Sequence, residues 1–227
     1  MKILLILLTI GLGISNPQKK DPDQILDQVK KTFNQVQDYV VDVNIKVDVD
    51  FIKMPETKAT IYFKQPDKVH LESENFAMLP REGLDFSPMG FLKTKYTAIY
   101  EKEDTVDGNK TDVIKVIPLE DESNVVLTTL WIDELRHIIR KVQSTLKVGG
   151  TFSIELKYDN SMNYPLPSSM IFTFNIERLN LPKGMGGQLN EDRSKEKKRA
   201  PGKVYVTYSN YKVNKGIPDS VFEEKKK

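Results

Sequence analysis

Apolar residues first recur along this chain with the period of a helix. Between residues 25 and 36 they are Ile25, Leu26, Val29, Phe33 and Val36. This spacing places one apolar stripe along a helix of three or four turns, with lysine and glutamine opposite. Asp21 and Pro22 predict where the helix begins, because Asp caps a helix and Pro suits its first turn.

From Tyr39 onwards the period changes to two. One face of the segment 39–51 carries Tyr39, Val41, Val43, Ile45, Val47, Val49 and Phe51. Polar residues such as Asp42, Lys46 and Asp48 occupy many of the alternate positions. This alternation is typical of a strand with one buried and one solvated face. It is the clearest structural prediction in the sequence.

Further alternating segments follow almost to the end of the chain. They lie at 59–63, 69–74, 96–103, 112–118, 125–133, 136–146, 151–159, 170–176 and 204–208. Asp107-Gly108-Asn109 marks a tight turn between two of them. About ten strands and a single long helix predict a mainly β (α+β) fold, with one curved antiparallel sheet and the helix packed on it. The helix covers only part of the apolar face, so the sheet either closes as a barrel or leaves a concave apolar cavity.

Residues 75–92 interrupt the strand rhythm with large apolar side chains among prolines and glycines. Pro and Gly disfavour a long helix or strand there. The segment is either a plug folded into the core or a lid over an apolar cavity, and one loop can do both. As candidate lid residues we single out Phe76, Met78, Leu79, Leu84, Phe86, Met89 and Phe91. The candidate groove residues are Val43, Ile45, Val47, Ile61 and Phe63.

Residues 181–202 contain several glycines followed by a run of charged residues. We expect 190–203 to form a mobile, solvated charged loop. The alternative is a basic finger that contacts anionic lipid headgroups or a partner protein. Acidic residues interleaved with the lysines weaken that alternative.

The first 15 residues have the features of a secretory signal peptide. Lys2 precedes the apolar run 3–14, and small residues stand at Gly13 and Ser15. The run is shorter than the roughly 20 apolar residues needed to cross a bilayer. We expect cleavage after Ser15, export, and a single domain over residues 16–227. An uncleaved membrane tether or a buried helix is the alternative.

Composition narrows the chemistry. The 34 basic and 32 acidic residues leave a net charge of +2, which argues against a nucleic-acid binder. The chain has no cysteine, which excludes disulfides, thiolate nucleophiles and cysteine-based zinc sites. No catalytic, phosphate-binding or dinucleotide-binding motif occurs. We therefore expect no catalytic residues, no metal and no cofactor, and a protein that is not an enzyme.

Four stretches occur in an order known from one family. They are the helix running into the first strand at 25–39, the strand–turn–strand segment 62–69, the segment 130–133, and the ending 211–222 with its Phe222. Together they resemble the LolA/LolB-like family of bacterial outer-membrane lipoprotein-sorting proteins. The resemblance spans nearly all of 16–227.

The resemblance implies an incomplete antiparallel barrel with a lid, which holds acyl chains on its concave apolar face. It implies a soluble periplasmic carrier whose partners are the acyl chains of lipids or lipoproteins and an envelope membrane protein. The family's carrier has an Arg before the Pro of the turn in 62–69, where this chain has Gln65. Gln65 cannot supply that residue's charge-assisted contact to the lid. The alternative function is an envelope sensor or interaction module that binds lipid or protein and signals through a partner.

Overall fold

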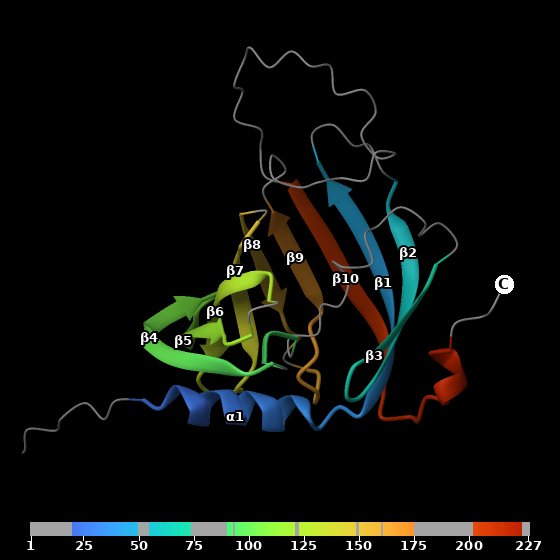
Figure 1. Cartoon of the computed structure of the whole chain (residues 1–227). Coiled ribbons are helices and arrows are strands. Elements are labelled where there is room, and N and C mark those ends of the chain that lie inside the picture. The colour runs from blue at the N-terminus through green and yellow to red at the C-terminus, as the bar shows by residue number, and fades with distance from the viewer. Residues whose placement is uncertain are drawn as a thin grey trace, which may run out of the picture.

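One antiparallel sheet and one α-helix make up the described structure (Figure 1). The computed structural model describes residues 20–49, 55–73, 90–92, 94–120, 123–148, 150–159, 161–174 and 202–223. The elements are α1 (Pro22–Phe33), β1 (Asp38–Asp48), β2 (Thr57–Lys64), β3 (Lys68–Glu72), β4 (Tyr96–Val106), β5 (Asn109–Pro118), β6 (Val125–Asp133), β7 (Ile139–Leu146), β8 (Thr151–Lys157), β9 (Ser169–Phe174) and β10 (Gly202–Val213). Two short 3-10 helices, Gly90–Leu92 and Asp219–Val221, accompany them. Among these residues, no helix is long and apolar enough to cross a membrane.

The sheet is open. Its strand order is β3-β2-β1-β10-β9-β8-β7-β6-β5-β4, and every neighbouring pair is antiparallel. The edge strands β3 and β4 do not pair with each other in the described structure. The predicted mainly β fold with a single curved antiparallel sheet is therefore confirmed, and of the two arrangements left open it is the unclosed one.

α1 begins where the sequence predicts. The Asp21 carboxylate accepts a hydrogen bond from the Asp23 N–H at 3.0 Å, and Pro22 stands at the first helical position. The helix ends at Phe33, before the last residue of the apolar stripe, Val36. Val36 is nevertheless fully buried, in the connection to β1. The periodicity thus found the buried positions but not the end of the helix.

The core lies between α1 and the face of the sheet toward it, which we call the inner face. Leu26 and Val29 of α1 join one buried cluster with Val41, Val43 and Ile45 of β1. Polar Asp42 and Lys46 on the other face of β1 are exposed. The alternation predicted for this strand is thus confirmed as far as Val49, whereas Phe51 lies outside the described residues.

One predicted strand begins later than its apolar pattern indicates. The prediction starts at residue 136, whereas β7 starts at Ile139. The Asp133 carboxylate accepts the N–H groups of Leu135 and Arg136 at 2.9 and 2.8 Å and forms a turn there. The tight turn predicted at Asp107-Gly108 is found, with φ of 48° and 76° at these two residues.

Candidate ligand-binding face

α1 lies across one end of the curved sheet (Figure 1). The Lys30 ammonium donates to the Tyr96 hydroxyl of β4 at 2.8 Å. Toward the other end of the strand order, the Phe33 ring meets the Phe63 ring of β2 at 5.8 Å between centroids. The helix therefore spans the open side of the sheet and covers this end of the inner face.

Aromatic side chains fill the end of the inner face near α1. Phe63 stacks on Tyr39 at 5.0 Å, and Tyr39 meets Tyr211 edge to face at 5.7 Å. The Tyr211 hydroxyl donates to the Pro167 carbonyl at 2.8 Å, and burial raises the pKa of Tyr211 and of Tyr208 well above the usual range. We call this group, Phe33, Tyr39, Phe63, Tyr208 and Tyr211, the aromatic core.

A small pocket beside the aromatic core shows how tightly this end is packed. It lies between Val29 and Phe33 of α1 and the segment 137–139, with Tyr158 and Pro165 completing its wall. It has room for about one water molecule. The packing at this end therefore leaves no space for an acyl chain among the residues that line this pocket.

The far end of the inner face carries a different set of apolar side chains. Their strands, β1, β10, β9 and β8, extend away from α1 (Figure 1). Across neighbouring strands Val47 pairs with Val204, Val204 with Phe172, and Phe174 with Phe152. We call these five residues the aromatic band.

The aromatic band is half-buried rather than buried. All five side chains have intermediate exposure, and Phe152, Phe172 and Val204 pack against the core cluster from outside it. The Phe172 ring centroid lies 5.5 Å from that of Phe152 and 5.2 Å from that of Phe174. Adjoining rings without charge make a surface for saturated hydrocarbon, which binds by burial of apolar area.

The structure separates the predicted groove residues into two groups. Val43, Ile45 and Phe63 are core residues, each no more than 3% exposed. Val47 and Ile61 are half-buried, and of the five only Val47 belongs to the aromatic band. Their contact with a ligand stays a prediction.

Most of the predicted lid lies outside the described residues. This applies to Phe76, Met78, Leu79, Leu84, Phe86 and Met89 and to the side chain of Phe91, whose backbone is in the short helix Gly90–Leu92. The neighbouring Leu92 is buried in the core cluster. The predicted signal peptide 1–15 and residues 190–201 of the charged loop also lie outside, whereas 202–203 begin β10.

The sequence did not single out Phe152, Phe172, Phe174 or Val204 as site residues. Each is an apolar position of a predicted strand. What was missing is the strand order, which sets β10 between β1 and β9 and so brings Val47 beside residues more than a hundred positions away. A run of Phe at alternate positions in β9 was the one local signal.

Gln65 occupies the turn between β2 and β3, where the family resemblance implies an Arg. Its side-chain amide donates to the Val36 carbonyl at 2.9 Å and to the Asn34 side-chain oxygen at 3.4 Å. The turn is thus joined to the segment that follows α1 through neutral hydrogen bonds. A contact exists at this position, but it lacks the charge that the Arg would supply.

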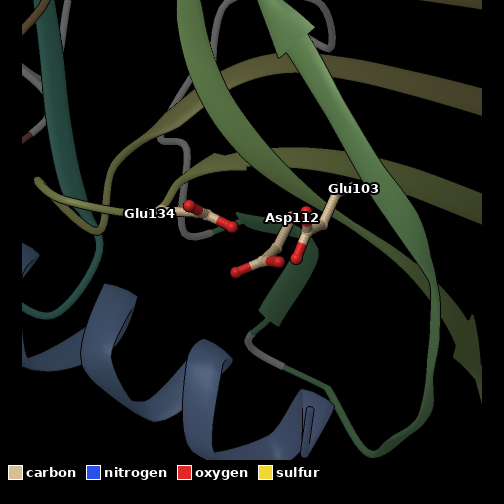
Figure 2. A group of neighbouring side chains, drawn as sticks. All are labelled: Glu103, Asp112 and Glu134. Atoms are coloured by element: carbon tan, nitrogen blue, oxygen red, sulfur yellow. The ribbon is translucent and has the colours of Figure 1, made fainter. Parts of the chain in front are cut away.

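A cluster of three carboxylates lies beside the N-terminal end of α1. Glu103 comes from β4, Asp112 from β5 and Glu134 from the turn after β6, and one oxygen from each lies within 4.8 Å of the others (Figure 2). The Lys20 ammonium lies 2.9, 2.7 and 2.5 Å from these carboxylates in that order. Carboxylates also bind hard cations, but here the ammonium is within hydrogen-bond distance of all three.

The charges in this cluster stabilise one another. Burial favours the neutral form of Lys20, but hydrogen bonds to Asp112, Glu134 and Glu103 outweigh it and raise the lysine pKa above its ordinary value. The hydrogen bond from Lys20 lowers the pKa of Glu103 in turn. Nothing local in the sequence pointed to this cluster, because Lys20 and Glu134 are 114 residues apart.

Comparison with known proteins identifies the fold through structure and not through sequence. No family model matches the sequence, and no curated protein matches it. A LolA superfamily protein from Nitrosomonas europaea is similar in structure, with a TM-score of 0.56, 12% identity, and coverage of 91% of this chain and 99% of that one. A domain from Vibrio parahaemolyticus described as an outer membrane lipoprotein-sorting protein is also similar, with a TM-score of 0.58 and 11% identity. The match covers 88% of this chain and 95% of that one.

A DUF1329 family protein from Desulfovibrio piger gives a TM-score of 0.56 and 13% identity, covering 90% of this chain and 98% of that one. At such low sequence identities, the structural similarity establishes the fold alone. The chain has a LolA-like fold, and the resemblance drawn from its sequence is confirmed at that level.

Proposed function

We propose that this protein binds the acyl chains of lipids or lipoproteins on the inner face of its sheet. The observation that carries the proposal is the aromatic band, a set of half-buried, uncharged side chains that continues the apolar core beyond α1. An acyl chain of about 15 methylenes costs roughly 12 kcal/mol to expose, at about 0.8 kcal/mol per CH₂. A carrier in water therefore needs an apolar surface of this kind.

The fold supports a more specific role, that of a periplasmic carrier in outer-membrane lipoprotein sorting. One protein that shares the fold is described as an outer membrane lipoprotein-sorting protein. The predicted signal peptide agrees with export. In this role the protein is not an enzyme, and it exchanges its cargo with an envelope membrane protein. No described residue favours the alternative role as a sensor.

Native mass spectrometry of the purified protein, followed by lipid extraction, tests acyl-chain binding. We expect the wild-type protein to retain diacyl or triacyl species, or to take up added lipid at near-stoichiometric amounts. Replacing Phe152 and Phe172 together by Ser should lower lipid retention at least tenfold, because the band loses two of its three rings.

Phe222→Ser is the matched control, since Phe222 is also half-buried but belongs to the C-terminal segment after β10. It should retain lipid as the wild type does. A wild-type protein that neither carries nor takes up lipid would contradict the proposal. So would equal lipid retention by the wild type and the double variant, provided that circular dichroism shows both to be folded.

A further inference from the structure

α1 connects strands that lie near opposite ends of the strand order. β4 is one edge strand, and β2 neighbours the other edge strand, β3. Lys30 binds α1 to β4 through Tyr96, and Phe33 packs on Phe63 of β2. Because β3 and β4 do not pair in the described structure, no backbone ladder fixes the distance between the two sides of the sheet there. Besides the ladder that runs through the sheet itself, α1 is thus a second connection between its two sides.

The N-terminal attachment of α1 is electrostatic. Lys20 directly precedes the capping residue Asp21, and its ammonium contacts the three carboxylates in Figure 2. The Asp112 side chain is only 7% exposed, and the Tyr100 hydroxyl also donates to it, at 3.2 Å. Hydrogen bonds between charged groups are roughly twice as strong as neutral ones. One side chain thus joins the start of α1 to β4, to β5 and to the turn after β6.

The C-terminal attachment is of a different kind. Phe33 is buried against Phe63, and Val36 is fully buried, so this end of α1 is part of the aromatic core. Releasing it requires exposure of large apolar side chains. Releasing Lys20 exposes mainly charged groups, which water solvates well. The N-terminal end, up to Leu26 as the first fully buried residue of the helix, is therefore where α1 detaches most easily.

We propose that Lys20, with Glu103, Asp112 and Glu134, forms a latch that holds α1 across the open sheet and controls how fast ligand leaves the aromatic band. This inference rests on the proposed function. With the latch closed, α1 keeps β4 and β5 at a fixed distance from β1 and β2 and so maintains the curvature of the inner face. With the latch open, the sheet flattens and its concave face makes fewer contacts with a bound chain.

The test combines amide hydrogen exchange with ligand release. The variant is Lys20→Gln, and the control is Lys31→Gln, which removes the same charge from an exposed position within α1. The ligand is a fluorescent polyene fatty acid, and its transfer to excess phospholipid vesicles gives the release rate. In Lys20→Gln we expect roughly tenfold faster exchange at the start of α1 and roughly tenfold faster release.

Exchange in β1 and β10 should be the same in Lys20→Gln as in the wild type, and Lys31→Gln should match the wild type in both measurements. Lys20→Arg should restore slow exchange and slow release. Glu103→Gln, which removes the most exposed of the three carboxylates, should give a smaller effect of the same sign.

Three results would overturn the latch. They are unchanged exchange in α1, faster exchange in α1 with unchanged release, and faster exchange throughout the sheet, which would make Lys20 a general stability residue. Failure of the wild-type protein to bind the fatty acid would instead overturn the proposed function itself. The two failures are therefore separate observations.

Discussion

Both ends of the inner face carry phenylalanine rings, but these rings are buried to different depths. Near α1, Phe63 is 2% exposed and packs between Phe33 and Tyr39. At the far end, Phe172 has similar ring neighbours but is only half-buried. A phenylalanine is therefore part of the closed core at one end and only half-buried at the other.

The largest effect is expected from Phe63→Ala in the aromatic core. Loss of a fully buried Phe leaves a cavity and should lower the free energy of unfolding by about 3–5 kcal/mol. Urea denaturation measures this. Lipid bound per folded molecule should stay constant, because the aromatic core is already filled. A specific loss of lipid would show instead that Phe63 is a groove residue, as the sequence alone predicts.

A buried ion pair gives the next effect. Arg140 donates from Nε to Asp133 at 2.7 Å, and both side chains are less than 10% exposed. Burial raises the pKa of Asp133, but hydrogen bonds from the Arg136 and Leu135 N–H groups and from Arg140 outweigh it and leave the pKa below its ordinary value. Asp133→Asn leaves Arg140 without its partner and should lower the free energy of unfolding by about 3 kcal/mol at pH 7.

The sign of the pH dependence follows from the direction of that shift. A carboxylate with a lowered pKa in the folded protein stabilises it above the unfolded pKa of about 3.9, and this contribution is lost as the pH falls through the folded value. The stability difference between the wild type and Asp133→Asn should therefore narrow below about pH 4. A difference that stays constant from pH 7 to pH 3 would contradict this assignment.

Phe172→Ala in the aromatic band should affect ligand affinity more than stability, whereas Phe63→Ala should affect stability more than ligand binding. Its half-buried ring contributes less to folding, so we expect a loss of about 1–2 kcal/mol in the free energy of unfolding. Affinity for a fatty acid should fall about tenfold, because one ring of the ligand surface is removed. Urea denaturation measures the free energy of unfolding, and isothermal titration calorimetry on the same preparation measures the affinity for the fatty acid. A stability loss as large as that of Phe63→Ala would remove the distinction between the two ends.

The smallest effect is expected at Gln65. Gln65→Ala removes the hydrogen bond to the Val36 carbonyl and should lower the free energy of unfolding by about 1 kcal/mol. Thermal denaturation detects a change of this size. No measurable change would mean that the turn between β2 and β3 is held by its backbone alone.

The fold was predictable because its signals are local. Alternation in β1, the Asp107-Gly108 turn and the Asp21 cap each depend on neighbours in sequence, and all three were found. The site was less predictable because its parts meet only through strand order. Val47 lies beside Val204, and Lys20 reaches Glu134, through pairings that no local pattern encodes.

The two-residue period also predicts on which face of the strand a side chain lies, but not how deeply that side chain is buried. Val43 and Val47 share one face of β1 and look alike in sequence. In the structure Val43 is 3% exposed, whereas Val47 is half-buried. Alternation does not give this difference, because Val49, two positions further along the same face, is buried again at 8% exposure.

Photocrosslinking with a diazirine-labelled fatty acid tests the central claim most directly. The labelled acid is bound to the wild-type protein and irradiated, and the modified peptides are identified by mass spectrometry. The account predicts modification in β8 and β9, at and around Phe152, Phe172 and Phe174. Modification confined to α1 and the strand ends that carry Phe63 and Tyr211, or no saturable modification at all, would contradict it.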